Sequence, residues 1–302
     1  MLYNPIMKEG ILVKRTRLNS ACIECLIKKH LTAFPDDVKE SDKLLYMQRM
    51  LGVLSGARED MSAPEMVEEI DKIKEELFGR GDDYSKIKKH FNALMLKEES
   101  SLTSEIEKAK NPFKKALSFA MAANYIDFGA MYKVDEETLK ESLYNKKEED
   151  FPETEKLYQD LKKAKHLLYI TDNCGEIVAD KIFIKEIMRE FPSLSVKALV
   201  RGKDVLNDAT IEDAEDVGLD LIVPVIKNGT GVPGTSIKKL SPEAREAFNE
   251  ADVIISKGQG NFETLMYSGN NIYYIFMCKC AMFAKRFGVE PLTGMLINDL
   301  RM

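Results

Sequence analysis

Three side chains in this sequence have the types and the spacing to bind a metal ion. Asp172 and Asn173 follow the apolar segment HLLYI after a single Thr, and Asp208 comes after the next apolar segment, SVKALV. Carboxylate and amide oxygens are the ligands that Mg²⁺ and Mn²⁺ prefer in proteins. None of the three His residues follows an apolar segment in this way, so a His-rich zinc site is not expected. A second interpretation stays open, because Asp and Asn at these positions could instead cap the next helix.

A lysine followed by a glycine-rich turn forms a second candidate site. Lys257 ends the apolar segment DVIISK, and Gly258, Gly260 and Asn261 follow it in the turn GQGN. Backbone N–H groups in such a turn, with a lysine and a following helix, can bind a phosphate group. The dinucleotide-binding pattern is not met, because Glu263 stands where its third glycine would be. The alternative is a tight turn from strand to helix, although a lysine at the end of a buried segment favours an anionic partner.

A polar pair lies in an otherwise apolar predicted helix. In AANYIDFGA, Asn124 and Asp127 are three residues apart and therefore share one helix face. A core helix tolerates such a pair only where its polar groups have partners. The pair could reach a ligand cleft or bond to a neighbouring helix, and both interpretations stay open.

The cysteines also allow two interpretations. Cys22 and Cys25 form a C-x-x-C motif on a predicted helix, which is half of a zinc site or a redox pair. Cys280, which follows Lys279 near the C-terminus, could complete such a cluster. The alternative is that these cysteines are buried and act as small apolar side chains. Cys174, beside the acidic positions, has no His nearby in the sequence, so we expect it to pack in the core.

These residues must be positioned by two parts of the chain with different patterns. Residues 1–155 show helical periodicity and no convincing strand, which predicts an all-helical N-terminal domain. Residues 156–302 alternate short apolar segments with amphipathic ones, which predicts an α/β domain. The expected fold is a doubly wound, mostly parallel sheet with helices on both faces. The predicted strands are 166–172, 195–201, 219–225, 252–258 and 272–277.

In a doubly wound sheet, ligands bind beyond the carboxyl ends of the strands. The segments after the first four predicted strands are all polar or rich in glycine, so they could line one cleft. Arg201 and Asn207 follow the second predicted strand and belong to this set. The glycine-rich segment 227–236 follows the third, and it could close over a ligand as a lid or be an ordinary surface loop.

The composition excludes several classes of protein. The chain has 302 residues, of which 44% are apolar and 31% charged, which is typical of a folded globular protein. The net charge of −6 gives no basic surface for nucleic acid. The N-terminal segment lacks the apolar core of a signal peptide, and no apolar segment reaches the roughly 20 residues of a membrane span. We therefore expect a cytoplasmic protein without nucleic-acid or membrane partners; no pattern indicates its oligomeric state.

Several motifs together resemble a known family. They are AANYIDFG, DNCGEIVAD, VLNDAT, NGTGVPGTS and ADVIISKGQGNFE. In order and spacing they are similar to the damage-control phosphatases, which are metal-dependent phosphatases of sugar phosphates and related phosphometabolites. The resemblance spans nearly the whole chain. The C-x-x-C motif and the pair Lys279-Cys280 resemble a subgroup found mostly in archaea and bacteria.

The resemblance implies roles for particular residues. It implies that Asp172, Asn173 and Asp208 bind a divalent metal, which we expect to be Mg, Mn, Co or Ni. It implies that Lys257 and the turn 258–261 meet the phosphate group of the substrate. Further candidates at or beside the motif positions are Glu176, Arg201, Asn207, Asn124 and Asp127.

The activity expected from the resemblance is hydrolysis of a small phosphate ester. In this hypothesis a metal-activated water attacks phosphorus, and Asp208 or Glu176 acts as the base. Lys257 and backbone N–H groups then neutralise the charge that develops on the phosphoryl group. A route through a phosphorylated Asp172 is the alternative, but the D-x-D pattern of haloacid dehalogenase-type phosphatases is missing.

Two rival hypotheses belong to other classes of protein. A carboxyl methyltransferase that uses S-adenosylmethionine would also have a doubly wound fold. Such enzymes usually place a glycine-rich turn after the first strand, where this chain has only Gly175. The other rival is a non-catalytic protein that binds a metal or a phosphometabolite.

Overall fold

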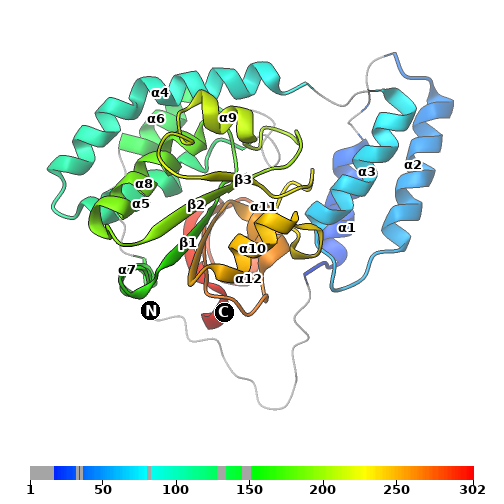
Figure 1. Ribbon diagram of the computed structural model, residues 1–302. Coiled ribbons are helices and arrows are strands. Elements are labelled where there is room, and N and C mark those ends of the chain that lie inside the picture. The colour runs from blue at the N-terminus through cyan, green and yellow to red at the C-terminus, as the bar shows by residue number, and fades with distance from the viewer. Residues whose placement is uncertain (1–16, 32–33, 35–36, 80–82, 128–133, 145–150) are drawn as a thin grey trace.

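Six strands form one sheet at the centre of the structure. The computed structural model (Figure 1) describes residues 17–31, 34, 37–79, 83–127, 134–144 and 151–302. The strand order is β3-β2-β1-β4-β5-β6; the first five strands of the chain run parallel, and β6 is antiparallel to β5. This arrangement confirms the predicted doubly wound, mostly parallel sheet. The strands are β1 His166–Ile170, β2 Ser195–Val200, β3 Val225–Lys227, β4 Val253–Lys257, β5 Ile272–Cys278 and β6 Thr293–Asn298.

Helices lie on both faces of this sheet (Figure 1). Because side chains alternate along a strand, β1 sends Leu167 and Tyr169 into one core and Leu168 and Ile170 into the other. The first core lies under α4, α5 and α8, and the second lies under α10, α11 and α12. Within the described ranges, no helix combines the length and the apolar character needed to cross a membrane. The helices are α1 Ser20–Leu31, α2 Glu40–Ser55, α3 Ala63–Phe78, α4 Ser85–Lys108, α5 Pro112–Ala123, α6 Glu136–Tyr144, α7 Thr154–Lys163, α8 Glu176–Glu190, α9 Ile211–Asp216, α10 Pro242–Glu250, α11 Gln259–Leu265 and α12 Ala281–Phe287, with short 3₁₀ turns at Ile237–Lys239 and Asp299–Arg301.

The predicted third strand is wrong in position. The segment 219–225 consists of turns almost to its end, and β3 begins only at Val225. Leu219 and Val223 are nevertheless buried, and their burial explains the apolar pattern. Pro224 stands just before β3 and cannot donate a ladder hydrogen bond. The sequence pattern also does not predict β6, because most of its side chains are only half-buried.

The helices α1, α2 and α3 have a hydrophobic core of their own, on the right in Figure 1. Met50 and Ile70 lie at its centre and are fully buried. The helices α4 and α5, by contrast, share the first core with the sheet. The predicted all-helical unit 1–155 therefore does not describe the packing, because the hydrophobic cores divide between α3 and α4 rather than at residue 155.

Helix α5 is buried all round. Every side chain from Ala116 to Ala123 is buried, and α5 contacts α4, α6, α8 and β5. A helix that is apolar on all sides must be covered on all sides. The periodicity of the sequence predicts this helix, but it does not say that a sheet covers it.

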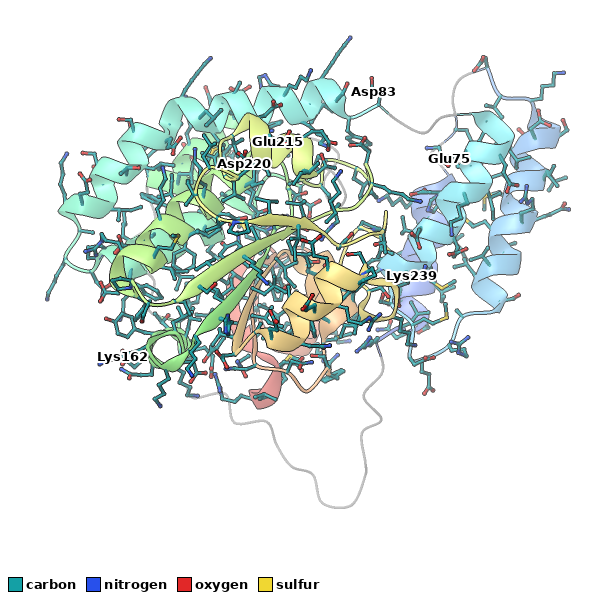
Figure 2. The ribbon with its side chains drawn as sticks, in the orientation of Figure 1. Glu75, Asp83, Lys162, Glu215, Asp220 and Lys239 are labelled. Carbon is teal, nitrogen blue, oxygen red and sulfur yellow. The ribbon has the colours of Figure 1, made fainter. Side chains whose placement is uncertain are left out.

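Polar contacts join the α1–α3 unit to the α/β part. Ser62 and Glu65 form a capping box at the start of α3, and Glu65 Oε1 also accepts a hydrogen bond from Ser236 Oγ at 2.6 Å. Lys239, labelled in Figure 2, lies on the same side and pairs with Glu68 of α3. The glycine-rich segment that ends at Ser236 is therefore held by a helix from the other unit.

Candidate active site

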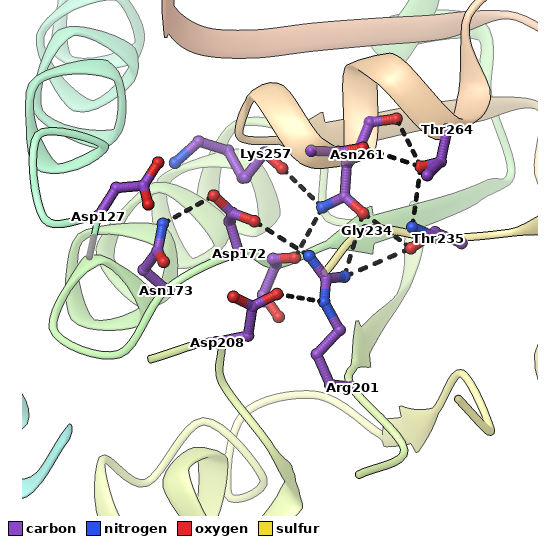
Figure 3. Close-up of polar contacts among 12 residues, drawn as sticks. Asp127, Asp172, Asn173, Arg201, Asp208, Gly234, Thr235, Lys257, Asn261 and Thr264 are labelled. Atoms are coloured by element: carbon purple, nitrogen blue, oxygen red, sulfur yellow. Dashed lines mark hydrogen bonds and ion pairs between the residues drawn. The ribbon is translucent and has the colours of Figure 1, made fainter. Parts of the chain in front are cut away.

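The predicted site residues meet at the carboxyl edge of the sheet. Asp172 follows β1, Arg201 follows β2, and Lys257 ends β4. The strand order reverses between β1 and β4, and doubly wound folds bind their ligands at such a point. Figure 3 shows Asp172, Arg201 and Asp208 side by side at this edge.

Asp172 and Asp208 share one buried guanidinium. Arg201 Nη2 is 3.0 Å from Asp172 Oδ1, and Arg201 Nε is 2.5 Å from Asp208 Oδ2. Arg201 is only 1% exposed, so bulk solvent screens these ion pairs little. Backbone contacts bring the two acids together, because Ala209 N donates to Asp172 O at 2.7 Å and Asn173 forms an isolated antiparallel bridge with Asp208. The segments after β1 and β2 thus converge on one point.

Two buried amides orient the acids from the other side. Asn173 Nδ2 donates to Asp172 Oδ2 at 2.7 Å and to Glu176 Oε2 at 3.1 Å. Asn124 Nδ2 donates to Glu176 Oε2 at 2.9 Å and lies 3.3 Å from Asp172 Oδ2. Asn124 is the C-cap residue of α5, so the helical half of the chain contributes directly to the site. Glu176 is also the first residue of the neighbouring helix α8, so the structure meets both interpretations left open for Asn124. The prediction that Asn124 and Asp127 share a helix face is wrong, because α5 ends at Ala123.

Two oxygens at this site accept no hydrogen bond from any residue that the structure describes. They are Asn173 Oδ1 and Asp208 Oδ1. The amide NH₂ of Asn173 faces the acids, so its carbonyl oxygen is directed away from them. Together with the Asp172 carboxylate, these oxygens are the donor set of two carboxylates and one amide that suits a hard divalent cation.

The site holds more buried carboxylates than buried cations. With every group ionised, four carboxylates face two cations, which leaves a formal charge of −2. A buried surplus of charge is unfavourable unless a counterion balances it. A divalent cation has the charge that this group lacks. The carboxylates belong to Asp172, Glu176, Asp180 and Asp208, and the cations are Arg201 and Lys257.

Burial shifts the pKa values of these acids upward. Burial raises the pKa of Asp172 well above its usual value, and the negative charges of Asp208 and Glu176 raise it further. Burial also raises the pKa of Asp208 to about 6, against the lowering effect of Arg201. A cation bound nearby would lower both pKa values again.

Lys257 lies behind the acids rather than at an open surface. Its Nζ is 2.6 Å from Glu176 Oε1, 2.6 Å from Asp180 Oδ1 and 2.8 Å from Ala120 O. The side chain is fully buried, and these three acceptors use its three N–H groups. A direct contact with a substrate phosphate would therefore require one of these bonds to break. The anionic partner expected for this lysine is present, and it is a pair of carboxylates within the protein.

The segment predicted as a turn, 258–261, consists of Gly258 and the first turn of α11, which begins at Gln259. It lies against both the acids and the glycine-rich segment. Gly258 has φ +82°, and its backbone passes directly beside Asp172. Gly260 packs against the carbonyl of Pro233 with no space for a side chain. Asn261 is fully buried, and its Oδ1 accepts from Arg201 at 3.0 Å. Gly258 and Gly260 thus contact the site through their backbone, and Asn261 contacts it by accepting a hydrogen bond from Arg201.

Asp127 and Asn207 occupy the rim of this group. Asp127 Oδ2 accepts from Lys279 Nζ at 2.8 Å, and Lys279 Nζ also donates to Asn124 O. Figure 3 shows the Asp127 carboxylate on the side of Asn173. Asn207 donates to Ile126 O at 3.4 Å, so it ties the end of α5 to the segment after β2.

The cysteines lie apart from this group. Cys22 is buried and Cys25 is exposed on α1, and Cys280 precedes α12; all three are free thiols. Burial raises the pKa of Cys22 and that of Cys280. Among the described residues, no three His, Cys, Asp or Glu side chains form a group able to hold a metal ion. The zinc interpretation gains no support from this, but Cys25 and Cys280 lie close enough to Cys22 for their charges to raise its pKa, so the cysteine cluster stays a prediction. Cys174 is fully buried, as expected for a packing residue.

Sequence reasoning missed two residues that contact the site. Asp180 lies four residues after Glu176 on α8 and bonds to Lys257. Thr235 donates to Asn261 Oδ1 at 2.8 Å and lies 3.4 Å from Arg201 Nη1. The signal for Asp180 was an acid in a helical segment, IVADKIFI, that is apolar apart from Asp180 and Lys181. Thr235 has no comparable signal within its glycine-rich segment.

The fold and the site define a doubly wound α/β protein with a buried acid–amide group at its topological switch point. The chain belongs to the damage-control phosphatase family, because residues 18–293 match the family model described as the damage-control phosphatase ARMT1-like domain. The family expected from the motifs is thus confirmed. The resemblance to a C-x-x-C subgroup stays a prediction.

Several relatives of this chain come from archaea. A damage-control phosphatase of Pyrococcus horikoshii is 38% identical over 189 residues, which cover 60% of this chain and 63% of that protein, just under two thirds of its length. A damage-control phosphatase of Archaeoglobus fulgidus is 34% identical over 220 residues, which cover 71% of this chain and 75% of that protein. An uncharacterized protein of Methanocaldococcus jannaschii is 32% identical over 304 residues, covering 93% of this chain and 95% of that protein.

A solved structure has the same fold. The crystal structure of a DUF89 family protein from Pyrococcus horikoshii matches with a TM-score of 0.75 and 28% sequence identity. The match covers 93% of this chain and 99% of that one. The α1–α3 unit, the sheet and its helices are therefore found together in a related protein.

Proposed function

We propose that this protein is a metal-dependent phosphatase that hydrolyses a small phosphate monoester, such as a sugar phosphate or a related phosphometabolite. The observation that carries the proposal is the buried acid–amide group at the carboxyl edge of the sheet, with its formal charge of −2. Two relatives whose names describe damage-control phosphatases support it.

The proposed metal ligands are Asp172, Asn173 and Asp208. Their oxygens suit Mg²⁺, Mn²⁺, Co²⁺ or Ni²⁺, and the charge of the group suits a divalent cation. A cation bound there would polarise a phosphoryl oxygen and lower the pKa of a bound water.

The remaining side chains hold the ligands in place. Arg201 fixes both carboxylates through its Nη2 and Nε, which leaves Oδ1 of Asp208 without a donor among the described residues. Both oxygens of Glu176 already accept hydrogen bonds from Asn124, Asn173 or Lys257. Of the two predicted bases, only Asp208 keeps an oxygen without a donor among the described residues, and this oxygen can either bind the metal or accept the proton of the attacking water, but not both at once; Glu176 orients the amides.

The substrate phosphate is proposed to lie beside the metal ligands at the first turn of α11, where Gln259 and Gly260 are half-buried, because Gly258 itself packs directly against Asp172. Backbone N–H groups of that turn would bind phosphoryl oxygens as they gain charge. Arg201 and Lys257 contribute two positive charges close by, although both are paired with carboxylates in this structure. The charge developing in the transition state would then lie within reach of fixed cations.

The test is phosphate release from a panel of sugar phosphates and related monoesters. The protein is treated with a chelator and then assayed alone and with Mg²⁺, Mn²⁺, Co²⁺ or Ni²⁺. We expect phosphate release only after a metal is restored. Full activity in the chelated protein would contradict the metal dependence. Binding of S-adenosylmethionine by calorimetry without any phosphate release would favour the methyltransferase, and metal binding without phosphate release would favour the non-catalytic protein.

A further inference from the structure

Asp180 and Glu176 hold the same ammonium group. They are four residues apart on α8 and therefore lie on one helix face. Lys257 Nζ is 2.6 Å from Glu176 Oε1 and 2.6 Å from Asp180 Oδ1, and all three side chains are fully buried. Tyr169 OH also donates to Asp180 Oδ1, at 2.7 Å. Asp180 thus competes with Glu176 for one buried positive charge.

Glu176 passes the effect of this competition to the proposed metal ligands. Its Oε1 accepts from both Lys257 Nζ and Asn124 Nδ2, and its Oε2 accepts from Asn124 and Asn173. The same two amides also face Asp172 Oδ2. A change in how strongly Lys257 attracts Glu176 therefore alters the position of the amides beside Asp172.

The environment of Asp180 is unfavourable for a residue with only a structural role. Asp180 Oδ2 receives no hydrogen bond from the residues that the structure describes, although the side chain is fully buried. A buried carboxylate with an unused oxygen costs stability, and apolar replacements of buried charge groups are often neutral or stabilising. A carboxylate at this position is therefore better explained by its effect on Lys257 than by its packing.

We propose that Asp180 is a positioning residue for the phosphatase reaction. By sharing Lys257 with Glu176, it sets the orientation of the Asn124 and Asn173 amides and thereby the geometry of the metal ligands. Asp180 does not touch the substrate in this scheme. The inference rests on the proposed function, because it assigns Asp180 a part in that same site.

The test compares Asp180→Asn with Asp299→Asn. Asp299 is also a buried carboxylate that accepts from a tyrosine hydroxyl, Tyr274 OH at 2.9 Å. It follows β6, at the opposite end of β5 from the site, so it controls for the loss of a buried charge. For Asp180→Asn we expect kcat to fall about tenfold or more with less than about a twofold change in KM. The dissociation constant for Mn²⁺, measured by calorimetry, should rise about tenfold, as for other residues that orient metal ligands.

The control should behave differently. Asp299→Asn should lower the melting temperature and leave kcat, KM and the Mn²⁺ dissociation constant unchanged. If Asp180→Asn does not fold, Tyr169→Phe removes one hydrogen bond from Asp180 and keeps every charge; it should lower kcat about threefold or more. Unchanged kcat and Mn²⁺ affinity in the variant that folds would overturn the inference.

The proposed function and the inference fail in distinguishable ways. An active wild type beside an equally active Asp180→Asn variant overturns the role of Asp180 and leaves the phosphatase proposal intact. A wild type that releases no phosphate overturns the phosphatase proposal. In that event the Mn²⁺ measurement alone decides about Asp180: weaker binding by the variant supports its positioning role, and equal binding overturns it.

Discussion

A Cβ atom built on Gly258 would lie 1.9 Å from Asp172 Oδ2. A carbon and an oxygen atom that are not bonded cannot approach so closely, so the backbone after β4 reaches the carboxylate only because residue 258 has no side chain. Gly258 also has φ +82°, a conformation that residues with side chains rarely adopt. The acid after β1 and the turn after β4 are therefore fitted to each other.

Replacing Gly258 by Ala should displace Asp172 by about 1 Å and lower kcat/KM about a hundredfold, because a displacement of that size in a catalytic site typically has an effect of that magnitude. Gly269 is the matched control, because its φ is +76° and an added Cβ would meet nothing within 4 Å. Gly269→Ala should cost about 1 kcal/mol in the free energy of unfolding, from backbone strain alone, and keep full activity. Steady-state kinetics and urea unfolding measure both effects. Equal activity in the two variants would rule out the proposed fit.

Replacing Asp172 by Ala should abolish metal-dependent hydrolysis without unfolding the protein. The change removes a proposed ligand, and it also removes a buried charge that repels Asp208 and Glu176. The change also breaks the buried pair with Arg201, which opposes this gain in stability. We therefore expect a folded protein that has lost Mn²⁺ binding by calorimetry. Retained hydrolysis with a bound metal would show that Asp172 is not a ligand.

Replacing Arg201 by Lys should lower both activity and stability. A lysine keeps the charge, but it cannot hold Asp172, Asp208 and Asn261 with one planar group. We expect kcat/KM to fall about tenfold or more and the free energy of unfolding to fall by about 3 kcal/mol, which is typical of a broken buried ion pair. Arg58 is the control, because its pair with Asp60 lies at the surface, with 65% and 56% of the two side chains exposed. Arg58→Lys should change neither quantity measurably.

The stability of the α1–α3 unit should fall in mild acid because of His30. This side chain is 4% exposed; its Nδ1 lies 2.7 Å from Tyr46 OH, and its Nε2 has no partner among the described residues. Burial lowers the pKa of His30 from 6.5 to about 4. The folded state therefore keeps the imidazole neutral while the unfolded chain takes up a proton, so stability is lost as the pH falls from about 6.5 toward 4.

Between pH 7 and pH 5 this linkage amounts to about 2 kcal/mol in the free energy of unfolding. His30→Gln removes the titrating group and keeps an acceptor for Tyr46. Urea unfolding followed by circular dichroism at both pH values should show a smaller loss for the variant than for the wild type. An equal loss in both proteins would mean that His30 does not control the acid sensitivity.

Much of the site could be predicted because strand ends mark it. Asp172, Asn173 and Asp208 follow apolar segments, and the parallel sheet brings those segment ends to one edge. The types of most elements and the family were readable because periodicity and motif order are properties of the chain itself. The strand β6 was missed because most of its side chains are only half-buried, and β3 was misplaced because the buried turn residues before it have the apolar pattern of a strand.

The partners of Lys257 could not be predicted from the sequence. Glu176 lies 81 residues away from it and Asp180 lies 77 residues away, and their meeting depends on how α8 packs against β4. An apolar segment ending in lysine indicates that an anion is near, but it does not distinguish a substrate phosphate from a protein carboxylate. The same limit applies to α4 and α5, whose periodicity shows that they are buried but not that the sheet buries them.

The burial of α5 on every side affects the order in which the chain folds. Asn124, at the end of this helix, accepts a hydrogen bond from Met277 N at 2.9 Å, and the two residues are 153 positions apart. When the ribosome has made α5, the strands that will cover it are not yet synthesised. Contacts over such a separation form slowly, and an uncovered apolar helix is prone to aggregate in the meantime. We therefore expect nascent chains that end before β5 to expose α5 and to bind chaperones.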